Sequence, residues 1–503
     1  MNKRSRVKSS LLNLRIVWIW QLIYMVVKFV SRRFFSQAMP VEYLGVESLY
    51  TNLIGILDIA ELGITTAVTS ALYMPLAKGD NEAIGKIMAT FASFYRVIAG
   101  IIVCIGLIIT PFITLISSDL KGLDYIHITF LLYLLASVLS YIWGYKSILL
   151  TADQRNYVYV RNHYVCILFQ NVIQVLVLLK WHSFMGYVIV MFIARFIEYG
   201  NISRITNNIY PFLKGSKQNN TQIRNKILND VKQVAVGKIG NSIIQSTDSI
   251  IISNVLGLYI GGLYSNYWLI ISSTLAIIIQ FPNSLTASIG NMVAEGNETQ
   301  INNMFWIIFL LNTSLFAVSS VLLGVLVQPF IDLWLGDSFR LQYIGVAAYI
   351  VVFFLSGIRS QLNSFKTARG LFQYESIRSV LECGTNLLIS IILAHYIGLV
   401  GVALGTIISS FCIGLPIELY NLSKGYNINM KKYLFYIAYL IISMLLIWFV
   451  CLHIQGKVLL AGIAELAAGS VSTVVIFTII WVVLISWTPI FKMTANYVRK
   501  RLK

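Results

Sequence analysis

The chain has 503 residues, of which 57% are hydrophobic and only 12% are charged, and its formal net charge is +18. Soluble domains carry about 25% charged residues, so a soluble globular protein is excluded. Apolar runs of roughly 17 to 25 residues, the length that crosses a bilayer as a helix, recur from LLNLRIVWIWQLIYMVVKFV near the start to VSTVVIFTIIWVVLISW near the end. Because these runs lack the alternation of barrel strands, they predict an all-α integral membrane protein.

The apolar runs predict about fourteen transmembrane helices. In chain order these cover residues 11–33, 45–76, 86–116, 125–150, 157–179, 183–205, 231–255, 259–290, 301–328, 341–365, 376–396, 399–421, 433–452 and 463–488. The first run is too long for a cleavable signal peptide, and no small-residue cleavage site follows it.

The positive charge is distributed unevenly between the two sides of the membrane. An even number of helices places both termini on one side, and the loops and tails of that side hold 25 of the 38 Lys and Arg residues, against six on the other. Cytoplasmic loops carry the Lys and Arg excess, so both termini are expected in the cytoplasm. The charge is thus explained by topology, and nucleic acid is not an expected partner.

Three short motifs recur at an offset of 214 to 217 residues. LYTN at 49–52 returns as LYSN at 263–266, the turn at 77–82 returns at 294–299, and the turn at 151–157 is echoed at 367–374. Each copy would contain six helices, so the two copies share one orientation, as in other parallel-repeat transporters. The predicted organisation is an N-terminal lobe (1–212), a cytoplasmic linker (213–230), a C-terminal lobe (231–424), and two additional helices with a basic tail (425–503).

Charged residues within the predicted helices are the candidate functional groups, because such residues face a bundle interior or an aqueous cavity. Guanidinium and ammonium groups bind phosphates, so a cationic cavity between the lobes would hold a diphosphate. Its candidate residues are Arg96, Lys146, Arg195, Lys238 and Arg359.

Neutralisation by nearby acids is the alternative for two of these cations. Glu61 would pair with Arg96, and Arg195 with Glu198 at a spacing of i, i+3. The other three cations have no acid close in sequence, and Lys28 is interpreted as a residue that reaches the interface or pairs with an acid.

The intramembrane acids Asp58, Glu61 and Asp248 admit two interpretations as well. Carboxylates in membranes relay protons or bind Na⁺, so these residues could couple transport to H⁺ or Na⁺. Structural ion pairs or hydrogen bonds between helices are the favoured explanation, and the coupling role stays open beside it.

Motifs for enzymatic chemistry are missing from the sequence. It has no Walker A motif, no cluster of His and Cys suited to a metal, and no Asp-x-Asp motif. We therefore expect a carrier that has no catalytic residues, no metal and no cofactor.

Ordered motifs resemble those of bacterial polysaccharide-biosynthesis flippases of the Wzx type. The matching residues are Glu61-Leu62-Gly63, Leu72-Tyr73-x-Pro75-Leu76-Ala77-x-Gly79-Asp80, Leu150-Thr151-Ala152-Asp153-Gln154-Arg155-x-Tyr157, Tyr210-Pro211, Asp248 to Ser253, Gly262 to Tyr267, Ser288 to Asn291, Leu333 to Gly336 and Gly398 to Ala403. They cover nearly the whole chain up to about residue 424.

The resemblance implies membership of the multidrug/oligosaccharidyl-lipid/polysaccharide exporter superfamily. Similar proteins carry undecaprenyl-diphosphate-linked oligosaccharide repeat units from the inner to the outer leaflet by alternating access, for capsule or exopolysaccharide biosynthesis, and other polysaccharide-assembly membrane proteins would be partners. A cation-coupled multidrug antiporter of the same superfamily and a membrane polysaccharide polymerase are the alternatives. A lipid II flippase is a close relative, but the motifs resemble the polysaccharide branch more.

Overall fold

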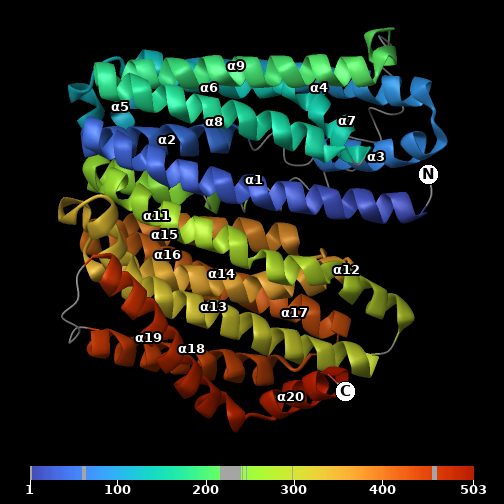
Figure 1. The fold of residues 1–503 in the computed structure, drawn as a ribbon, viewed down its shortest axis with the longest axis vertical. Helices are drawn as coiled ribbons and strands as arrows, with labels where there is room; N and C mark the ends of the chain where they lie inside the picture. The colour runs from blue at the N-terminus through green and yellow to red at the C-terminus, as the bar shows by residue number, and fades with distance from the viewer. Residues whose placement is uncertain are drawn as a thin grey trace. The chain divides into compact units, whose positions relative to one another are not determined.

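The computed structural model describes residues 3–58, 64–153, 155–215, 240, 242–244, 246–296, 298–426, 428–455 and 462–502. Every regular element in these ranges is a helix (Figure 1). Eleven of the described helical segments are long and apolar enough to cross a membrane. The predicted all-α integral membrane fold is therefore confirmed.

Three predicted spans are not among those eleven. The span 11–33 lies within α1 (Lys3–Ala38), and 45–76 covers two helices, α2 (Val41–Leu57) and α3 (Ile64–Lys78). The span 231–255 falls only partly within the described residues. The count of about fourteen transmembrane helices therefore stays a prediction.

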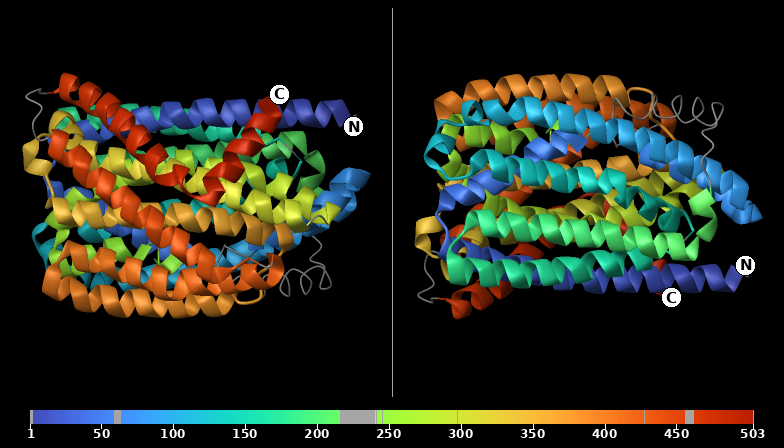
Figure 2. Two further views of the ribbon diagram at one scale, coloured as in Figure 1. Left: turned by 90° about the horizontal axis from the view of Figure 1, so that it is seen from below. Right: turned by 90° about the horizontal axis from the view of Figure 1, so that it is seen from above.

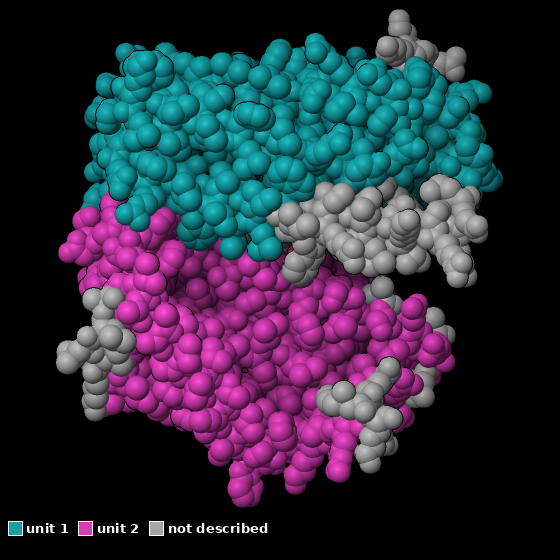
Figure 3. Space-filling model, viewed as in Figure 1, with its two compact units in different colours: residues 1–262 teal, residues 263–503 magenta. Residues whose placement is uncertain are grey.

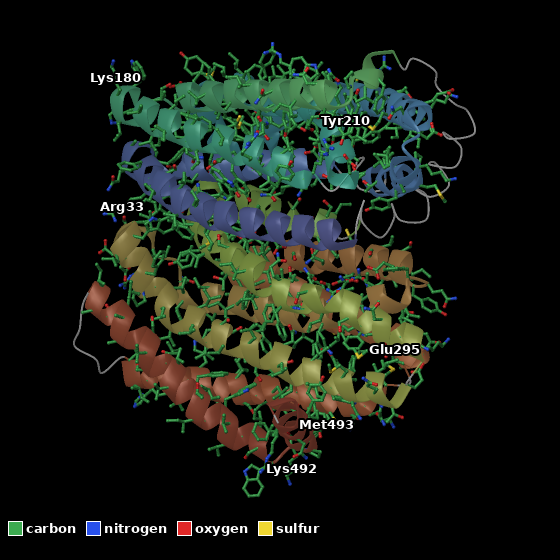
Figure 4. All side chains as sticks on the ribbon, turned by 45° about the vertical axis from the view of Figure 1, so that its right-hand side comes forward. Arg33, Lys180, Tyr210, Glu295, Lys492 and Met493 are labelled. Atoms are coloured by element: carbon green, nitrogen blue, oxygen red, sulfur yellow. The ribbon has the colours of Figure 1, made fainter. Side chains whose placement is uncertain are left out.

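The described chain divides into two compact units, residues 1–262 and 263–503 (Figure 3). The first unit contains α1 to α3, followed by α4 (Asn81–Ile109), α5 (Ile113–Ile116), α6 (Ile126–Ile142), α7 (Ser147–Ala152), α8 (Asn156–Trp181) and α9 (Phe184–Ile209). Its long helices run side by side (Figures 1 and 2). Arg33 and Lys180 lie at one end of this unit, and Tyr210 lies toward the other end (Figure 4).

Side chains and left-handed residues set several helix ends in the first unit. The Asp80 carboxylate accepts a hydrogen bond from the Ala83 N–H at 2.9 Å where α4 begins, and the Ser183 hydroxyl accepts one from the Gly186 N–H at 3.1 Å where α9 begins. These bonds satisfy donors that a helix start leaves unpaired. The chain turns between α8 and α9 at His182, whose φ is 47°.

The internal repeat reappears as matched helix ends. Gly79 follows α3 with a φ of 71°, and Gly296 follows α12 (Gln280–Glu295) with a φ of 75°. A glycine adopts this left-handed conformation without the steric penalty of a Cβ. The two turns therefore share a backbone geometry as well as a sequence pattern, 217 residues apart.

The helical stretch after the predicted linker packs in the first unit. Its π-helical end, Ile252–Leu256, carries Asn254, whose amide donates to the Ile116 carbonyl. The Leu258 N–H donates to the Asp119 carboxylate at 2.8 Å. The two units meet in sequence at residue 262. The predicted linker lies almost wholly outside the described residues, and the predicted lobe bounds stay a prediction.

The second unit is built around a long central helix, α13 (Glu298–Trp334). The other helices are α12 and most of α11 (Leu258–Ile278), with α14 (Tyr343–Arg369), α15 (Glu375–Ile397), α16 (Leu399–Ser409), α17 (Leu415–Tyr426), α18 (Met430–Gln455), α19 (Ile463–Ser486) and α20 (Pro489–Leu502).

The two helices beyond the repeat, α18 and α19, pack on this unit through indole groups. Trp481 Nε1 donates to the Ser314 hydroxyl of α13 at 2.9 Å, and Trp448 Nε1 donates to the Tyr343 hydroxyl at 2.8 Å. A Cβ at Gly324 would lie 2.1 Å from the Trp448 ring, so this close packing requires a glycine on α13.

Candidate functional site

A polar cavity of about 220 Å³ lies within the first unit. Five helices supply its walls: α1, α2, α6, α8 and α9. The lining residues are Tyr24, Lys28, Ser31, Arg32, Phe35, Glu47, Thr51, Tyr133, Ile167, Gln170, Asn171, Gln174, Tyr187, Met191 and Arg195. Because α2, α6 and α9 begin near these residues while α1 and α8 end near them, the cavity lies toward the end of the unit that holds Arg33 and Lys180 (Figure 4).

One face of α1 forms a wall of the cavity. Tyr24, Lys28, Ser31, Arg32 and Phe35 are spaced by three or four residues, which places them on the same side of a helix. Leu22 and Ile23, which precede this stretch, and Val26 and Val30 within it have exposed side chains, as suits a surface that faces lipid. Helix α1 is therefore amphipathic here, with Lys28 and Arg32 directed into the cavity.

Three cations and one carboxylate line the cavity. Arg32 Nη1 lies 2.9 Å from Glu47 Oε2, and the Tyr187 hydroxyl donates to Glu47 Oε1 at 3.2 Å. The Lys28 Nζ lies 6.0 Å from the centre of the Tyr24 ring and has no carboxylate partner among the described residues. The cavity therefore keeps an excess of positive charge.

Arg195 on α9 is the third cation of the cavity. Its Nη1 lies 2.8 Å from Oε2 of Glu198, one turn further along the helix. From the sequence, Arg195 could either pair with Glu198 or line a cavity. The ion pair is formed, and Arg195 also lines the cavity. The two interpretations do not exclude each other, because a guanidinium has five N–H donors.

The arrangement is suited to binding an anion. Uncompensated cations inside a membrane protein are costly, and they become favourable when an anionic ligand supplies the missing charge. Guanidinium and ammonium groups bind phosphate oxygens through charge-assisted hydrogen bonds. The cavity is smaller than the roughly 300–1,000 Å³ of sites that enclose a drug-sized ligand, so it has room for a small charged group.

The other predicted cavity cations lie elsewhere. Arg96 on α4 is exposed, and its Nε donates to the Ala92 carbonyl at 3.3 Å. Lys146 donates to the Ser203 hydroxyl at 2.9 Å and to Asn207 Oδ1 at 3.1 Å. Neither lines the cavity of the first unit. Lys238 lies outside the described residues.

Arg359 on α14 belongs to a closed charge network in the second unit. Its guanidinium donates to Glu382 Oε2 at 3.0 Å and to Glu418 Oε1 at 2.9 Å, and both carboxylates are buried. These partners are 23 and 59 residues away in sequence, which explains why no nearby partner could be assigned. With two carboxylates bonded to it, Arg359 is best explained as a structural residue.

Further cations and acids complete this network. Arg378 contacts Glu382 and lies 2.6 Å from Glu375, and Lys366 lies 2.7 Å from the same Glu375. The network thus contains three cations and three carboxylates. Gly414 approaches it closely, since a Cβ there would lie 2.8 Å from the Glu382 oxygens.

The structure describes two of the three acids that were predicted to couple transport to an ion. Asp58 follows α2 and accepts hydrogen bonds from the Ser137 hydroxyl at 2.7 Å and the Tyr141 hydroxyl at 3.0 Å. Asp248 is buried in the helical stretch that precedes Ile252–Leu256. Glu61 lies outside the described residues, so its pairing with Arg96 stays a prediction.

Sequence reasoning missed two of the three cavity cations. Lys28 was interpreted as a residue that reaches the interface or pairs with an acid, and Arg32, at the end of the predicted span 11–33, was not among the candidates. The helix continues to Ala38, so Arg32 lies well inside it. The signal was present in the spacing of Tyr24, Lys28 and Arg32, which form one polar stripe in an otherwise apolar run.

Comparisons with solved structures identify the fold. The chain is similar to a structure of the lipid II flippase MurJ in an inward closed conformation, with a TM-score of 0.66 and 14% sequence identity over 93% of this chain and 98% of that one. It is also similar to an inward-facing multidrug resistance MATE family transporter of the MOP superfamily, with a TM-score of 0.61 and 12% identity over 81% and 97% of the two chains. The fold is therefore like that of these two proteins.

A third similar structure is a point mutant of the MATE transporter VcmN from Vibrio cholerae, with a TM-score of 0.53 and 14% identity over 84% and 98% of the two chains. No family model matches the sequence, and no curated protein matches it. The comparisons therefore show a transporter-like fold, and membership of the superfamily stays a prediction.

Proposed function

We propose that this protein is a flippase that moves undecaprenyl-diphosphate-linked oligosaccharides across a bacterial plasma membrane for capsule or exopolysaccharide biosynthesis. The main support is the cavity of the first unit, which is lined by Lys28, Arg32 and Arg195 and by one carboxylate, Glu47. A diphosphate supplies the charge that this cavity lacks.

An apolar groove beside the cavity supports an amphiphilic substrate. It has a volume of about 390 Å³, lies between α8 and α9, and is lined by Cys166, Phe169, Gln170, Ile173, Val190, Ile193, Ala194 and Ile197. Gln170 lines both the groove and the cavity. A prenyl chain in the groove would place its diphosphate among the cations, while the oligosaccharide would extend out of the small cavity.

The multidrug antiporter is the second candidate, because MATE transporters share the fold. A carrier of cationic drugs needs acidic or apolar walls, and the excess of cations around Lys28 argues against it. The third candidate is an enzyme, a membrane polysaccharide polymerase. The likeness to transporters favours a carrier over this enzyme, and the described residues hold no cluster of His, Cys, Asp and Glu that suits a metal.

Deletion of the gene followed by lipid extraction tests the proposed function. We expect a polyprenyl-diphosphate oligosaccharide to accumulate on the cytoplasmic side, and the wild-type protein to restore normal lipid levels. Accumulation of lipid II instead would identify a lipid II flippase. Unchanged lipid pools together with altered drug sensitivity would overturn the proposal in favour of the antiporter.

A further inference from the structure

One buried carboxylate joins a histidine to a cation of the cavity. Glu198 on α9 is only 1% exposed at its side chain. Its Oε1 lies 2.6 Å from Nδ1 of His163 on α8, and its Oε2 lies 2.8 Å from Nη1 of Arg195. A carboxylate accepts hydrogen bonds only, so Nδ1 of His163 carries the proton of this bond.

Among the described residues, Glu198 is the carboxylate that His163 contacts. On its own helix, the rings of Tyr159 and Tyr164 lie 5.7 and 5.2 Å from the imidazole. Other charged or titratable groups near the pair are Cys166 of α8 and Arg195 and Tyr199 of α9. Tyr24 of α1 lies against Tyr164, and Lys28 follows one turn later on α1. Helix α7, which also packs on α8, has no titratable side chain.

Arg195 has donors to spare for a ligand. A guanidinium carries five N–H groups, and within the described part of the chain the Arg195 side chain uses one of them, for Glu198. The same residue lines the cavity. Glu198 therefore partly neutralises Arg195 without occupying the side of the guanidinium that an anion would approach.

We propose that His163 and Glu198 form a proton site that sets the affinity of Arg195 for the anion in the cavity. The inference rests on the proposed function, since it assigns the control of the same anion site. His163 and Glu198 are positioning residues, because they act on the ligand through Arg195.

The coupling follows from charge balance. An added proton binds Nε2 of His163, and the imidazolium then shares the negative charge of Glu198 with Arg195. Arg195 is less neutralised, and it attracts an anion more strongly. Linkage is reciprocal, so a bound anion also favours proton uptake by His163. Histidine side chains in general change charge near neutral pH, so pH is the variable that tests this coupling.

Binding of farnesyl diphosphate to the purified full-length protein, measured at about pH 5 and about pH 8, tests this inference. For each variant, the affinity at pH 5 is divided by the affinity at pH 8. We expect this ratio to be larger in the wild type than in His163→Gln by about fivefold or more, the lower end of typical coupling between sites. Titration of the ligand itself is common to all variants and cancels in this comparison. His127→Gln, on an exposed histidine of α6, should keep the wild-type ratio.

Two further variants separate the possible outcomes. Glu198→Gln should bind more tightly than the wild type at pH 8 and lose the His163-dependent part of the pH response. Equal affinity ratios in the wild type, His163→Gln and Glu198→Gln would overturn the proton site alone, provided that Lys28→Gln weakens binding at both pH values. Absence of binding by the wild type, or no effect of Lys28→Gln, would overturn the anion site and the proton site together.

Discussion

The two units of the protein treat intramembrane charge in opposite ways. In the first unit, Lys28, Arg32 and Arg195 face a cavity that has one lining carboxylate. In the second unit, three cations meet three carboxylates in a buried network centred on Glu382. A charge-balanced network stabilises the fold without any ligand. A cavity with excess positive charge is instead neutralised when an anionic ligand binds. Substitutions of charged residues should therefore affect folding in the second unit and ligand binding in the first.

The largest effect is expected at the centre of the balanced network. Glu382→Gln keeps the size of the side chain but leaves three cations with two carboxylates. Breaking a buried ion pair costs about 3–5 kcal/mol, and we expect a loss of this order in the stability of the second unit. Thermal unfolding in detergent measures it. An unchanged unfolding temperature would show that the network contributes little to the fold.

Reversal of a cavity charge comes next. Lys28→Glu removes a cation and adds a carboxylate, and we expect binding of a prenyl diphosphate to weaken by about 10- to 100-fold, as befits the loss of a hydrogen bond to a charged group. The unfolding temperature should stay near that of the wild type, because Lys28 has no carboxylate partner among the described residues. Lys180→Glu, at the exposed end of α8, is the matched control and should bind normally. Comparable binding by both variants would contradict the assignment of the cavity.

Removal of the cavity's carboxylate should act in the opposite direction. Glu47→Gln frees Arg32 from its ion pair and raises the positive charge of the cavity. We expect tighter diphosphate binding by about fivefold, which corresponds to about 1 kcal/mol. Titration calorimetry can detect this gain. Weaker binding would mean that Glu47 is needed to orient Arg32 toward the ligand.

The smallest effect is expected for an exposed pair of the second unit. Arg369 Nη2 lies 2.8 Å from Glu298 Oε1, and the Glu298 side chain is 56% exposed. Exposed ion pairs contribute about 0–1 kcal/mol, so Glu298→Gln should barely change the unfolding temperature. A loss as large as that of Glu382→Gln would break the distinction between buried and exposed charge on which the comparison of the two units depends.

The all-helical fold and the matching turns of the two halves could be predicted from the sequence because both depend on local patterns. Apolar runs of sufficient length define spans, and the turns at Gly79 and Gly296 share a motif and a left-handed backbone. The ion pair of Arg195 with Glu198 could also be foreseen, since its spacing places both residues on one helix face.

The rest of the site depends on contacts between helices distant in sequence. The partners of Arg359 lie on α15 and α17, and those of Glu47 lie on α1 and α9. No periodicity within one helix encodes such pairs. For this reason the predicted cavity included Arg359, which two carboxylates neutralise. It omitted Arg32, which pairs with Glu47, and Lys28, which has no carboxylate partner among the described residues.

The central claim is that the cavity of the first unit holds the diphosphate of a lipid-linked oligosaccharide. A photoreactive amino acid at Thr51, which lines the cavity, should capture this lipid in native membranes, and mass spectrometry of the adduct would identify it. The same probe at Thr478, an exposed position on α19, serves as the control. The account predicts a polyprenyl-diphosphate oligosaccharide attached at position 51 and not at 478. Capture of ordinary phospholipids alone at both positions would contradict it.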